Sequence, residues 1–126
     1  PDNVLMPGYI DNSIIKGAYR YAKCLLFTSY EETEGIVVLE ALASECPVLV
    51  RDIGVYSDWL KDGRDCYKAK NNDEFLDKID YILNHDNGEI IKNGQKRMDE
   101  RDIPLIGQEL KKTYEYLLDK FKENGK

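Results

Sequence analysis

The sequence predicts an α/β fold in which a parallel sheet is flanked by helices and followed by further C-terminal helices. Short apolar runs alternate with longer segments whose apolar residues recur at helical spacing, which is typical of the strand–helix units of a parallel sheet. The chain has 126 residues, and 42% of them are hydrophobic. That length and composition suffice for the core of one ordinary domain.

Four apolar runs between turn residues are expected to form strands. They lie at residues 3–6 (NVLM), 24–28 (CLLF and Thr28), 48–50 (VLV) and 66–69 (CYKA). Pro7-Gly8 closes the first run, and the turn signal Asp62-Gly63 precedes the last. Because helices connect the first three strands, we expect those strands to be parallel, with the short fourth strand on the sheet edge.

Helical periodicity predicts the elements between and after these strands. Helices are expected at about 12–23, 35–45 and 55–61, after Asn71, over 86–102, and at the C-terminal end. Asn71 and Glu74 form an N-terminal capping signature. The helix after Asn71 has one apolar face, which comprises Phe75, Leu76, Ile79, Ile82 and Leu83. The last helix has one apolar stripe, which comprises Leu110, Tyr114, Leu117, Leu118 and Phe121.

Composition excludes several classes of function. The net charge of -6 argues against a nucleic-acid backbone as the main partner, because phosphate binding needs a basic surface. The three cysteines, Cys24, Cys46 and Cys66, are few and widely spaced, so we expect reduced core thiols. His85 is the one histidine, which leaves no zinc cluster and no histidine-based triad. No apolar run approaches the roughly 18 residues that span a bilayer.

A glutamate interrupts the expected helix at about 35–45. The apolar residues of this helix cover nearly its whole circumference, so we expect it to be buried between layers. Glu40 and Ser44, one turn apart, form a narrow polar seam on it. A buried carboxylate is costly unless it is paired or binds a ligand. Two interpretations stay open: the carboxylate reaches solvent or a nearby Lys or Arg, or it binds a ligand.

The residues just before this helix suggest an anion site. Gly35 follows the loop that leaves the strand at 24–28, so it is expected at the carboxyl edge of the parallel sheet, where such folds bind ligands. The first amides of a helix lack intrahelical partners and, with the helix dipole, favour an anion such as phosphate. A glycine lets a ligand approach the backbone closely. The alternative is that Gly35 merely starts the helix.

The pattern E-x-x-G-I-V-x-L-E-A, from Glu32 to Ala41, resembles the paired-glutamate motif of retaining glycosyltransferases of family four. These enzymes have two Rossmann-like domains, the GT-B fold. The segments NVLMPGYI, CLLFTSY and CPVLVRDIG resemble the family's strands and loops on either side of the motif, so the resemblance covers about residues 3–84. Many relatives have G-F-G-L-P inside the motif, and Thr33 and Glu34 depart from that pattern.

The resemblance implies a division of the chain. Residues 1–84 would be the later part of a Rossmann-like domain that binds the nucleotide-sugar donor, and residues 85–126 would be C-terminal helices packing on it. The N-terminal acceptor domain and the basic residues that neutralise the diphosphate would lie upstream. We therefore expect the chain to be a fragment that is inactive alone.

The resemblance also implies roles for individual residues. Glu40 would bind the ribose hydroxyls, and Glu32 would act at the transferred sugar; spacing alone does not choose between Glu31, Glu32 and Glu34. The backbone at Gly35, Ile36 and Val37 would face the diphosphate or sugar. Ile10, after Gly8, would bind the base through its backbone, with Lys16 nearby as a donor-site candidate or a plain surface lysine. The class implies no metal and no cofactor beyond the UDP-sugar.

The fuller strings SYEETEGIVVLEALA and VRDIGVYSDWL are most similar to bacterial glucosyltransferases that add glucose to diacylglycerol or to its monoglucosyl form. This similarity implies a cytoplasmic enzyme that moves glucose from UDP-glucose to a glycolipid acceptor. The enzyme would be a peripheral protein on the inner face of the bacterial cell membrane. The alternatives are a capsule or cell-wall polysaccharide glycosyltransferase and a non-catalytic nucleotide-binding domain. No nucleic-acid partner is expected.

Overall fold

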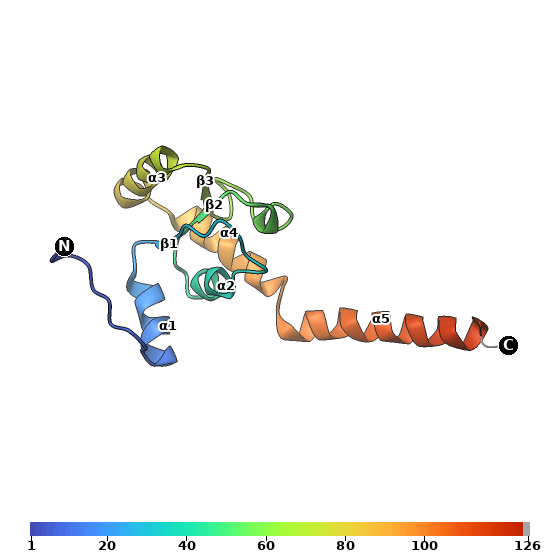
Figure 1. The fold of residues 1–126 in the computed structure, drawn as a ribbon. Coiled ribbons are helices and arrows are strands. Elements are labelled where there is room, and N and C mark those ends of the chain that lie inside the picture. The colour runs from blue at the N-terminus through green and yellow to red at the C-terminus, as the bar shows by residue number, and fades with distance from the viewer. Residues whose placement is uncertain (125–126) are drawn as a thin grey trace.

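A sheet of three parallel strands organises the computed structural model, which describes residues 1–124 (Figure 1). The strands are β1 (Leu25–Phe27), β2 (Val48–Arg51) and β3 (Tyr67–Ala69), and they lie in the order β1-β2-β3. All four residues of the central strand β2 are buried. Because successive side chains point to opposite faces, Val48 and Val50 join one apolar cluster and Leu49 joins another.

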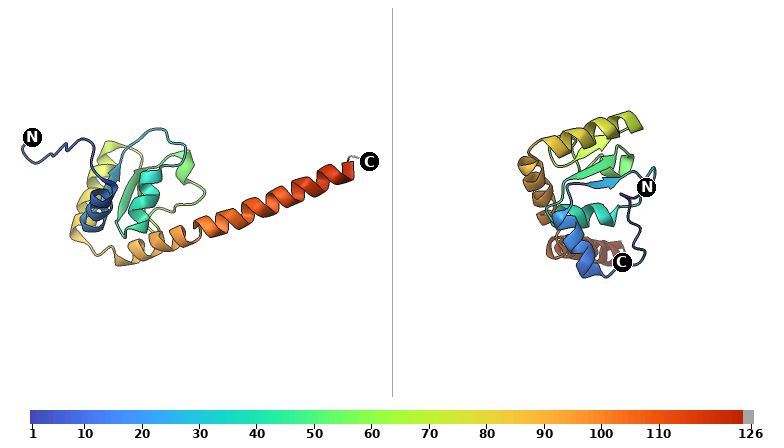
Figure 2. Two further views of the ribbon diagram at one scale, coloured as in Figure 1. Left: turned by 90° about the horizontal axis from the view of Figure 1, so that it is seen from below. Right: turned by 90° about the vertical axis from the view of Figure 1, so that its left-hand side faces the viewer.

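Helices cover both faces of this sheet (Figure 2). In chain order the helical elements are α1 (Asn12–Tyr21), α2 (Ile36–Ala43), the 3₁₀ turn η1 (Gly54–Tyr56), α3 (Asn72–Asn84), α4 (Gly88–Asp99) and α5 (Ile103–Asn124). The helix α3 packs on one face of the sheet and α2 packs on the other, with α1 and α4 against α2. The α/β architecture with a parallel sheet is therefore confirmed.

Most of the expected elements are present close to their predicted positions. The strands at 24–28 and 48–50 are parallel neighbours, and the strand at 66–69 lies on the sheet edge, as predicted. The predicted N-cap is confirmed: the Asn71 side chain accepts a hydrogen bond from the Glu74 amide at 3.0 Å, and the Glu74 carboxylate accepts one from Asn71 Nδ2 at 2.9 Å.

The expected strand at 3–6 is absent from the described structure, so that prediction is wrong. Its apolar side chains are open to solvent, with Leu5 and Met6 exposed to 90% and 89%. Backbone pairing holds a strand in place, and no strand within residues 1–124 pairs with this segment. The amide of Val4 instead closes a turn onto the carbonyl of Pro1 at 3.1 Å.

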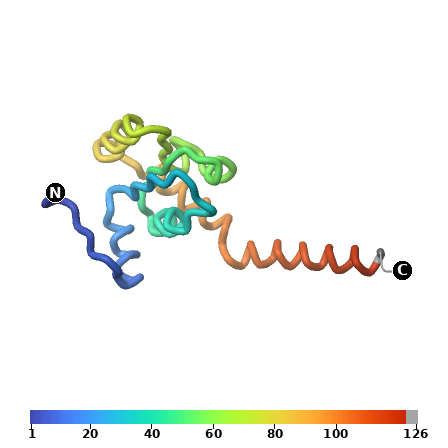
Figure 3. Tube along the Cα trace, viewed as in Figure 1, coloured from blue at the N-terminus to red at the C-terminus, as the bar shows by residue number. Residues whose placement is uncertain are grey.

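The two C-terminal helices differ in how they meet the domain. The helix α4 lies against α2, whereas α5 extends away from the sheet and its helices, with its apolar stripe exposed (Figure 3). On α3, Phe75 and Ile82 are buried, but Leu76 and Leu83 of the predicted apolar face are more than half exposed. None of the helices described over residues 1–124 is long and apolar enough to cross a membrane.

The close approach of α4 to α2 depends on Gly94. A β-carbon at Gly94 would lie 2.7 Å from Leu42 Cδ2 and 2.8 Å from the carbonyl oxygen of Asp65. Because a backbone oxygen cannot swing aside, we expect Gly94→Ala to lower the free energy of unfolding by about 1–3 kcal/mol. Urea denaturation of the whole protein, followed by circular dichroism, measures this loss.

Gly107→Ala on α5 is the matched control for this prediction. No described atom lies within 4 Å of a β-carbon at Gly107. Alanine is a better helix former than glycine, so this variant is expected to be as stable as the unaltered protein or more stable. Equal urea midpoints for the two variants would contradict the packing role of Gly94.

Candidate functional site

The loop between β1 and α2, residues 28–35, lies at the carboxyl edge of the strands, where parallel α/β sheets bind ligands. A buried arginine holds its first half. Arg51, which is 6% exposed, donates from Nε to the carbonyl of Thr28 at 3.0 Å and from Nη1 to the carbonyl of Lys70 at 3.1 Å. Its guanidinium also lies 3.9 Å from the ring centroid of Tyr30. The loop therefore leaves the sheet along a defined path.

Gly35 fixes the other end of the loop, at the N-terminus of α2. Its backbone is left-handed, with φ 76° and ψ 58°. A β-carbon at this position would overlap the hydroxyl of Tyr56 and would lie 3.2 Å from Tyr56 Cζ. Glycine is thus required both for the backbone conformation and for the close contact. Within the described chain no side chain caps α2, so the amides of Ile36 and Val37 are available to an anion.

The hydroxyl of Tyr56 is buried under this loop. The side chain is 0% exposed, and its oxygen has no hydrogen-bond partner among the described residues. Burial, and to a smaller extent the charge of Glu32, raises the pKa of Tyr56 to about 12, so the hydroxyl is neutral at physiological pH. A buried donor without a partner is costly, which makes Tyr56 a candidate member of the site.

Glu40 is exposed, which corrects the expectation that α2 is buried nearly all round. The buried residues of α2 are Val38, Ala41 and Leu42, whereas Ile36 is 64% exposed. The Tyr19 hydroxyl of α1 donates a hydrogen bond to Glu40 Oε2 at 3.4 Å. Burial and the nearby carboxylate raise the pKa of Tyr19. The carboxylate of Glu40 therefore faces solvent on the same face of α2 as Ile36, which lies one turn earlier.

The three glutamates of the loop have different surroundings. Glu34 lies 3.8 Å from Arg101, whose guanidinium lies over the ring of Trp59 at 4.3 Å from its centroid. Glu32 is half-buried and close enough to Tyr56 to influence its titration. Glu31 is exposed. Glu34 thus has a cation nearby, Glu31 is open to solvent, and Glu32 lies closest to the buried Tyr56 hydroxyl in its electrostatic effect; the choice of Glu32 stays a prediction.

The other predicted donor-site residues lie on the N-terminal segment and α1. Gly8 has a left-handed φ of 71°, and Ile10 is half-buried just before α1. Lys16 lines a groove with Arg20 and the C-terminal end of α2. Since an eight-residue helix is about 12 Å long, Lys16 and Gly35 lie at opposite ends of α2. Glu32 and Gly35 lie in the loop that precedes α2, Glu40 lies one turn into that helix, and Lys16 lies beside its far end.

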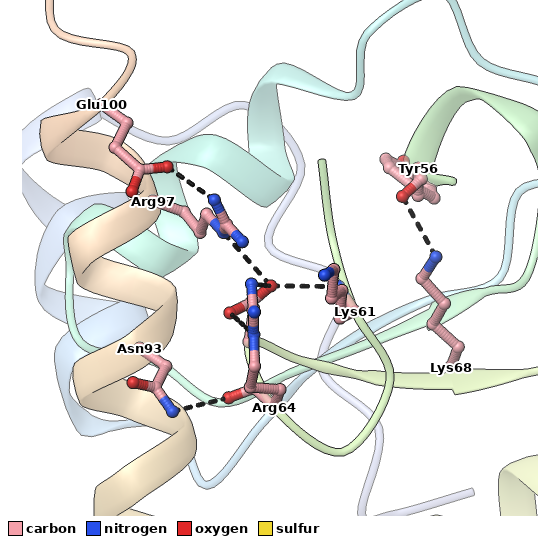
Figure 4. A network of polar contacts seen from close by, with 8 residues as sticks. Tyr56, Lys61, Arg64, Lys68, Asn93, Arg97 and Glu100 are labelled. Atoms are coloured by element: carbon pink, nitrogen blue, oxygen red, sulfur yellow. Dashed lines mark hydrogen bonds and ion pairs between the residues drawn. The ribbon is translucent and has the colours of Figure 1, made fainter. Parts of the chain in front are cut away.

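Two buried charges hold the segments that support Tyr56, as Figure 4 shows. Lys68 of β3 donates from Nζ to the carbonyl of Tyr56 at 3.0 Å. Asp65, which is 2% exposed, accepts hydrogen bonds from the Lys61 amide, from Arg64 and from Arg97 of α4. These bonds fasten the segment from η1 to β3 onto the sheet and onto α4.

The cysteines are free thiols, as predicted. Burial raises the pKa of Cys24 and of Cys66 to about 12, which makes both thiols poor nucleophiles. No group of three or more His, Cys, Asp or Glu side chains in the described part of the chain is placed to hold a metal ion.

Sequence reasoning missed Tyr19, Tyr56 and Arg101. None of the three is a candidate site residue on sequence grounds. Each contacts the motif from a distant part of the chain. Periodicity and spacing report only local neighbours, so no pattern in this one sequence indicates these contacts.

Comparison with known proteins identifies relatives that include this site. Residues 1–103 match the family described as glycosyl transferases group 1. A processive diacylglycerol alpha-glucosyltransferase from Acholeplasma laidlawii is 50% identical over 118 residues, which cover 94% of this chain and 36% of that protein.

Two further relatives are more distant. An alpha-monoglucosyldiacylglycerol synthase from Acholeplasma laidlawii is 28% identical over 120 residues, covering 94% of this chain and 30% of that protein. An alpha-galactosylglucosyldiacylglycerol synthase from Streptococcus pneumoniae is 32% identical over 56 residues, covering 44% of this chain and 15% of that protein. The chain thus spans about a third of the length of the first two relatives.

Gly35 and Tyr56 can be tested as a pair. We expect Gly35→Ala to destabilise the whole protein by about 2 kcal/mol or more, because left-handed backbone costs a residue with a β-carbon 1–2 kcal/mol and the overlap with Tyr56 adds to it. Tyr56→Phe alone should leave stability unchanged or raise it, since the lost hydroxyl has no partner in the described structure.

The double variant separates the two causes. Tyr56→Phe removes the oxygen that a β-carbon at Gly35 would overlap, so the double variant should recover part of the stability lost in Gly35→Ala. The backbone strain remains, so recovery is incomplete. Thermal melts of the three variants measure both terms, and purely additive effects would show that the contact with Tyr56 is unimportant.

Proposed function

The chain belongs to the glycosyl transferase group 1 family, and from that premise we propose that it is the later part of the donor-binding domain of a retaining hexosyltransferase. The whole protein moves glucose from UDP-glucose to a diacylglycerol-type glycolipid. The observation that carries this proposal is the 50% identity, over 94% of the chain, to a protein named as a processive diacylglycerol alpha-glucosyltransferase. That alignment is long enough to include the loop 28–35 and α2.

Glu40 binds the ribose in this proposal. Its carboxylate has two acceptor oxygens, which match two neighbouring hydroxyls and give charge-assisted hydrogen bonds. The side chain is exposed, and among the described residues its hydrogen-bond partner is Tyr19, whose hydroxyl lies 3.4 Å from Oε2. A ligand can therefore replace or share that contact without breaking the core.

The start of α2 binds the diphosphate or the sugar. The amides of Ile36 and Val37 receive no side-chain cap from the described residues, and Ile36 is exposed, whereas Gly35 is buried against Tyr56. Fixed amide dipoles at a helix N-terminus stabilise negative charge that develops as the sugar–phosphate bond breaks. Because the helix is anchored on the sheet, these dipoles need no reorganisation during the reaction.

Glu32 holds a hydroxyl of the transferred glucose. Its half-buried position beside Tyr56 limits the directions that its carboxylate can take, whereas Glu34 is engaged by Arg101. A carboxylate bound to a sugar hydroxyl orients the ring relative to the diphosphate, which contributes to catalysis through positioning. At the other end of the nucleotide, the backbone at Gly8 and Ile10 binds the base, and Lys16 is a surface lysine beside the far end of α2.

The acceptor is a lipid in this proposal. The names of all three relatives above specify diacylglycerol glycolipids, which favours a lipid over a capsule or cell-wall polysaccharide. The acceptor is bound mainly by the N-terminal domain of the whole protein, which works at the inner face of a bacterial cell membrane as a peripheral protein. The donor is the only small molecule needed, with no metal ion or other cofactor.

The direct test is a transfer assay with the whole protein, UDP-glucose, and diacylglycerol or its monoglucosyl form in mixed micelles. We expect a glucosylated lipid whose amount increases with time, and an α-linkage by proton NMR of the isolated product. Nucleotide-sugar binding without any glucosylated lipid would contradict the proposal and would favour a polysaccharide acceptor or a non-catalytic nucleotide-binding role.

The two glutamates are expected to divide the donor between them. Glu40→Gln or Glu40→Ala should weaken both UDP and UDP-glucose, by about 1–3 kcal/mol, because ribose is common to the two ligands. Glu32→Ala should lower turnover with UDP-glucose but leave UDP bound nearly as before, because UDP carries no glucose.

Calorimetry with UDP on the variants of the whole protein measures this contrast. Glu40→Gln removes the charge but keeps nearly the same side-chain volume at an exposed position, so it tests the loss of the carboxylate without a change in the fold. Equal losses of UDP affinity in Glu32→Ala and Glu40→Ala would mean that the sugar-binding glutamate has been assigned wrongly. Glu31→Ala and Glu34→Ala would then identify its replacement.

A further inference from the structure

The loop that bears the predicted sugar-binding glutamate rests on two aromatic rings. Tyr56 packs against Gly35 from below, and its ring meets the ring of Trp59 edge to face, with centroids 6.0 Å apart and planes at 68°. Trp59 Nε1 donates a hydrogen bond to the carbonyl of Val55 at 2.9 Å, which fixes the orientation of its ring. The rings of Tyr56 and Trp59 form a support for the loop, and Gly35 lies against the Tyr56 side of this support.

Arg101 joins this support to the loop. Its guanidinium lies over Trp59, 4.3 Å from the ring centroid, and its Nη1 lies 3.8 Å from Glu34 Oε1. Glu34 precedes Gly35 directly and follows Glu32 by two positions. One side chain therefore contacts both the support and the loop that rests on it, at a point between Glu32 and Gly35.

The backbone of Arg101 is held at the end of α4. Its amide donates to the carbonyl of Met98 at 2.9 Å, at the end of α4. Arg97, one turn earlier, bonds to the buried Asp65, and Gly94 brings α4 against α2. Because α4 is fixed at these points, the backbone of Arg101 is held near Trp59 and Glu34. A cation held in this way restricts the loop more than a free surface lysine would.

We propose that Arg101 is a positioning residue, which holds the loop 31–35 through Glu34 so that Glu32 meets the sugar of the donor. The inference rests on the proposed function and deepens it, because it assigns Glu34 to the support of the loop and not to the ligand. Arg101 touches neither the donor nor the reacting atoms in this arrangement. Its effect passes through the position of Glu32.

The contact is poorly suited to a merely structural role. Glu34 and Arg101 are 57% and 37% exposed, and ion pairs with such exposure contribute little to the stability of a fold. A small displacement of a group that orients a substrate is, in contrast, felt strongly in the rate. Removal of the Arg101 side chain is therefore expected to lower kcat and to leave the free energy of unfolding nearly unchanged.

The test uses the whole protein and UDP-glucose transfer to diacylglycerol micelles. For Arg101→Gln and for Glu34→Gln we expect kcat to fall about threefold to tenfold, while the Kd for UDP changes by less than about twofold, because UDP has no sugar for Glu32 to hold. The double variant should lose no more than either single variant, because the two side chains act through one contact. The charge-reversed pair Glu34→Arg with Arg101→Glu should regain part of the turnover, because the ion pair is restored while the contact of Arg101 with Trp59 is lost.

Lys111→Gln is the matched control, since it removes an exposed cation of α5 that pairs with Glu115 instead of the loop. Melting temperatures of all variants confirm that each is folded. Losses that multiply in the double variant, or unchanged kcat in Arg101→Gln, would overturn the positioning role and leave the proposed function intact. No transfer by the unaltered protein would remove the proposed function and this inference with it.

Discussion

The left-handed turn at Gly35 is the constraint on which the arrangement of the site depends. One residue redirects the chain from the loop after β1 into α2, and it does so while in contact with Tyr56. A side chain there would force the segment η1 away from α2 or rotate the start of the helix. The free amides at the start of α2 point along the helix axis, and Ile36 and Glu40, one turn apart, lie on the same exposed face of the helix.

Buried charges maintain this geometry from below. Arg51, Lys68 and Asp65 are each less than 10% exposed, and each bonds to backbone groups of a connecting segment. Burying a charge is unfavourable unless its hydrogen bonds are satisfied, and here the bonds reach loops that apolar packing cannot hold. The sheet is thus held by Val, Leu and Cys side chains, whereas the loops at its carboxyl edge are held by polar ones. Such a division suits a site whose backbone must be fixed and yet open to a charged ligand.

The sequence predicted what local patterns determine. The apolar strands β1 and β2, the cap at Asn71 and the position of Gly35 at the sheet edge all follow from residues close together in the chain. The segment 3–6 has the composition of a strand, but strand formation depends on a pairing partner that composition does not reveal. Glu40 was placed in a buried helix because the periodicity of α2 shows which residues are apolar and not how much of the helix other elements cover. Tyr56 and Arg101 contact the loop across long separations in sequence, which local patterns do not indicate.

The exposed face of α2 explains why a carboxylate stands in so apolar a helix. A face turned to solvent alone would be expected to carry several polar residues, yet Ile36 at its start is apolar and 64% exposed. The same face has uncapped amides at its N-terminus and a single acid, Glu40, one turn later. Solubility does not require this combination, since an apolar residue at the first turn works against it. In the proposed function each part has a ligand group opposite it: the amides meet a diphosphate, Glu40 meets the ribose, and Ile36 is covered by the nucleotide lying along the helix. Most of the apolar composition of α2 reflects its packing against the sheet, α1 and α4, and only the exposed Ile36 is left for the donor to cover.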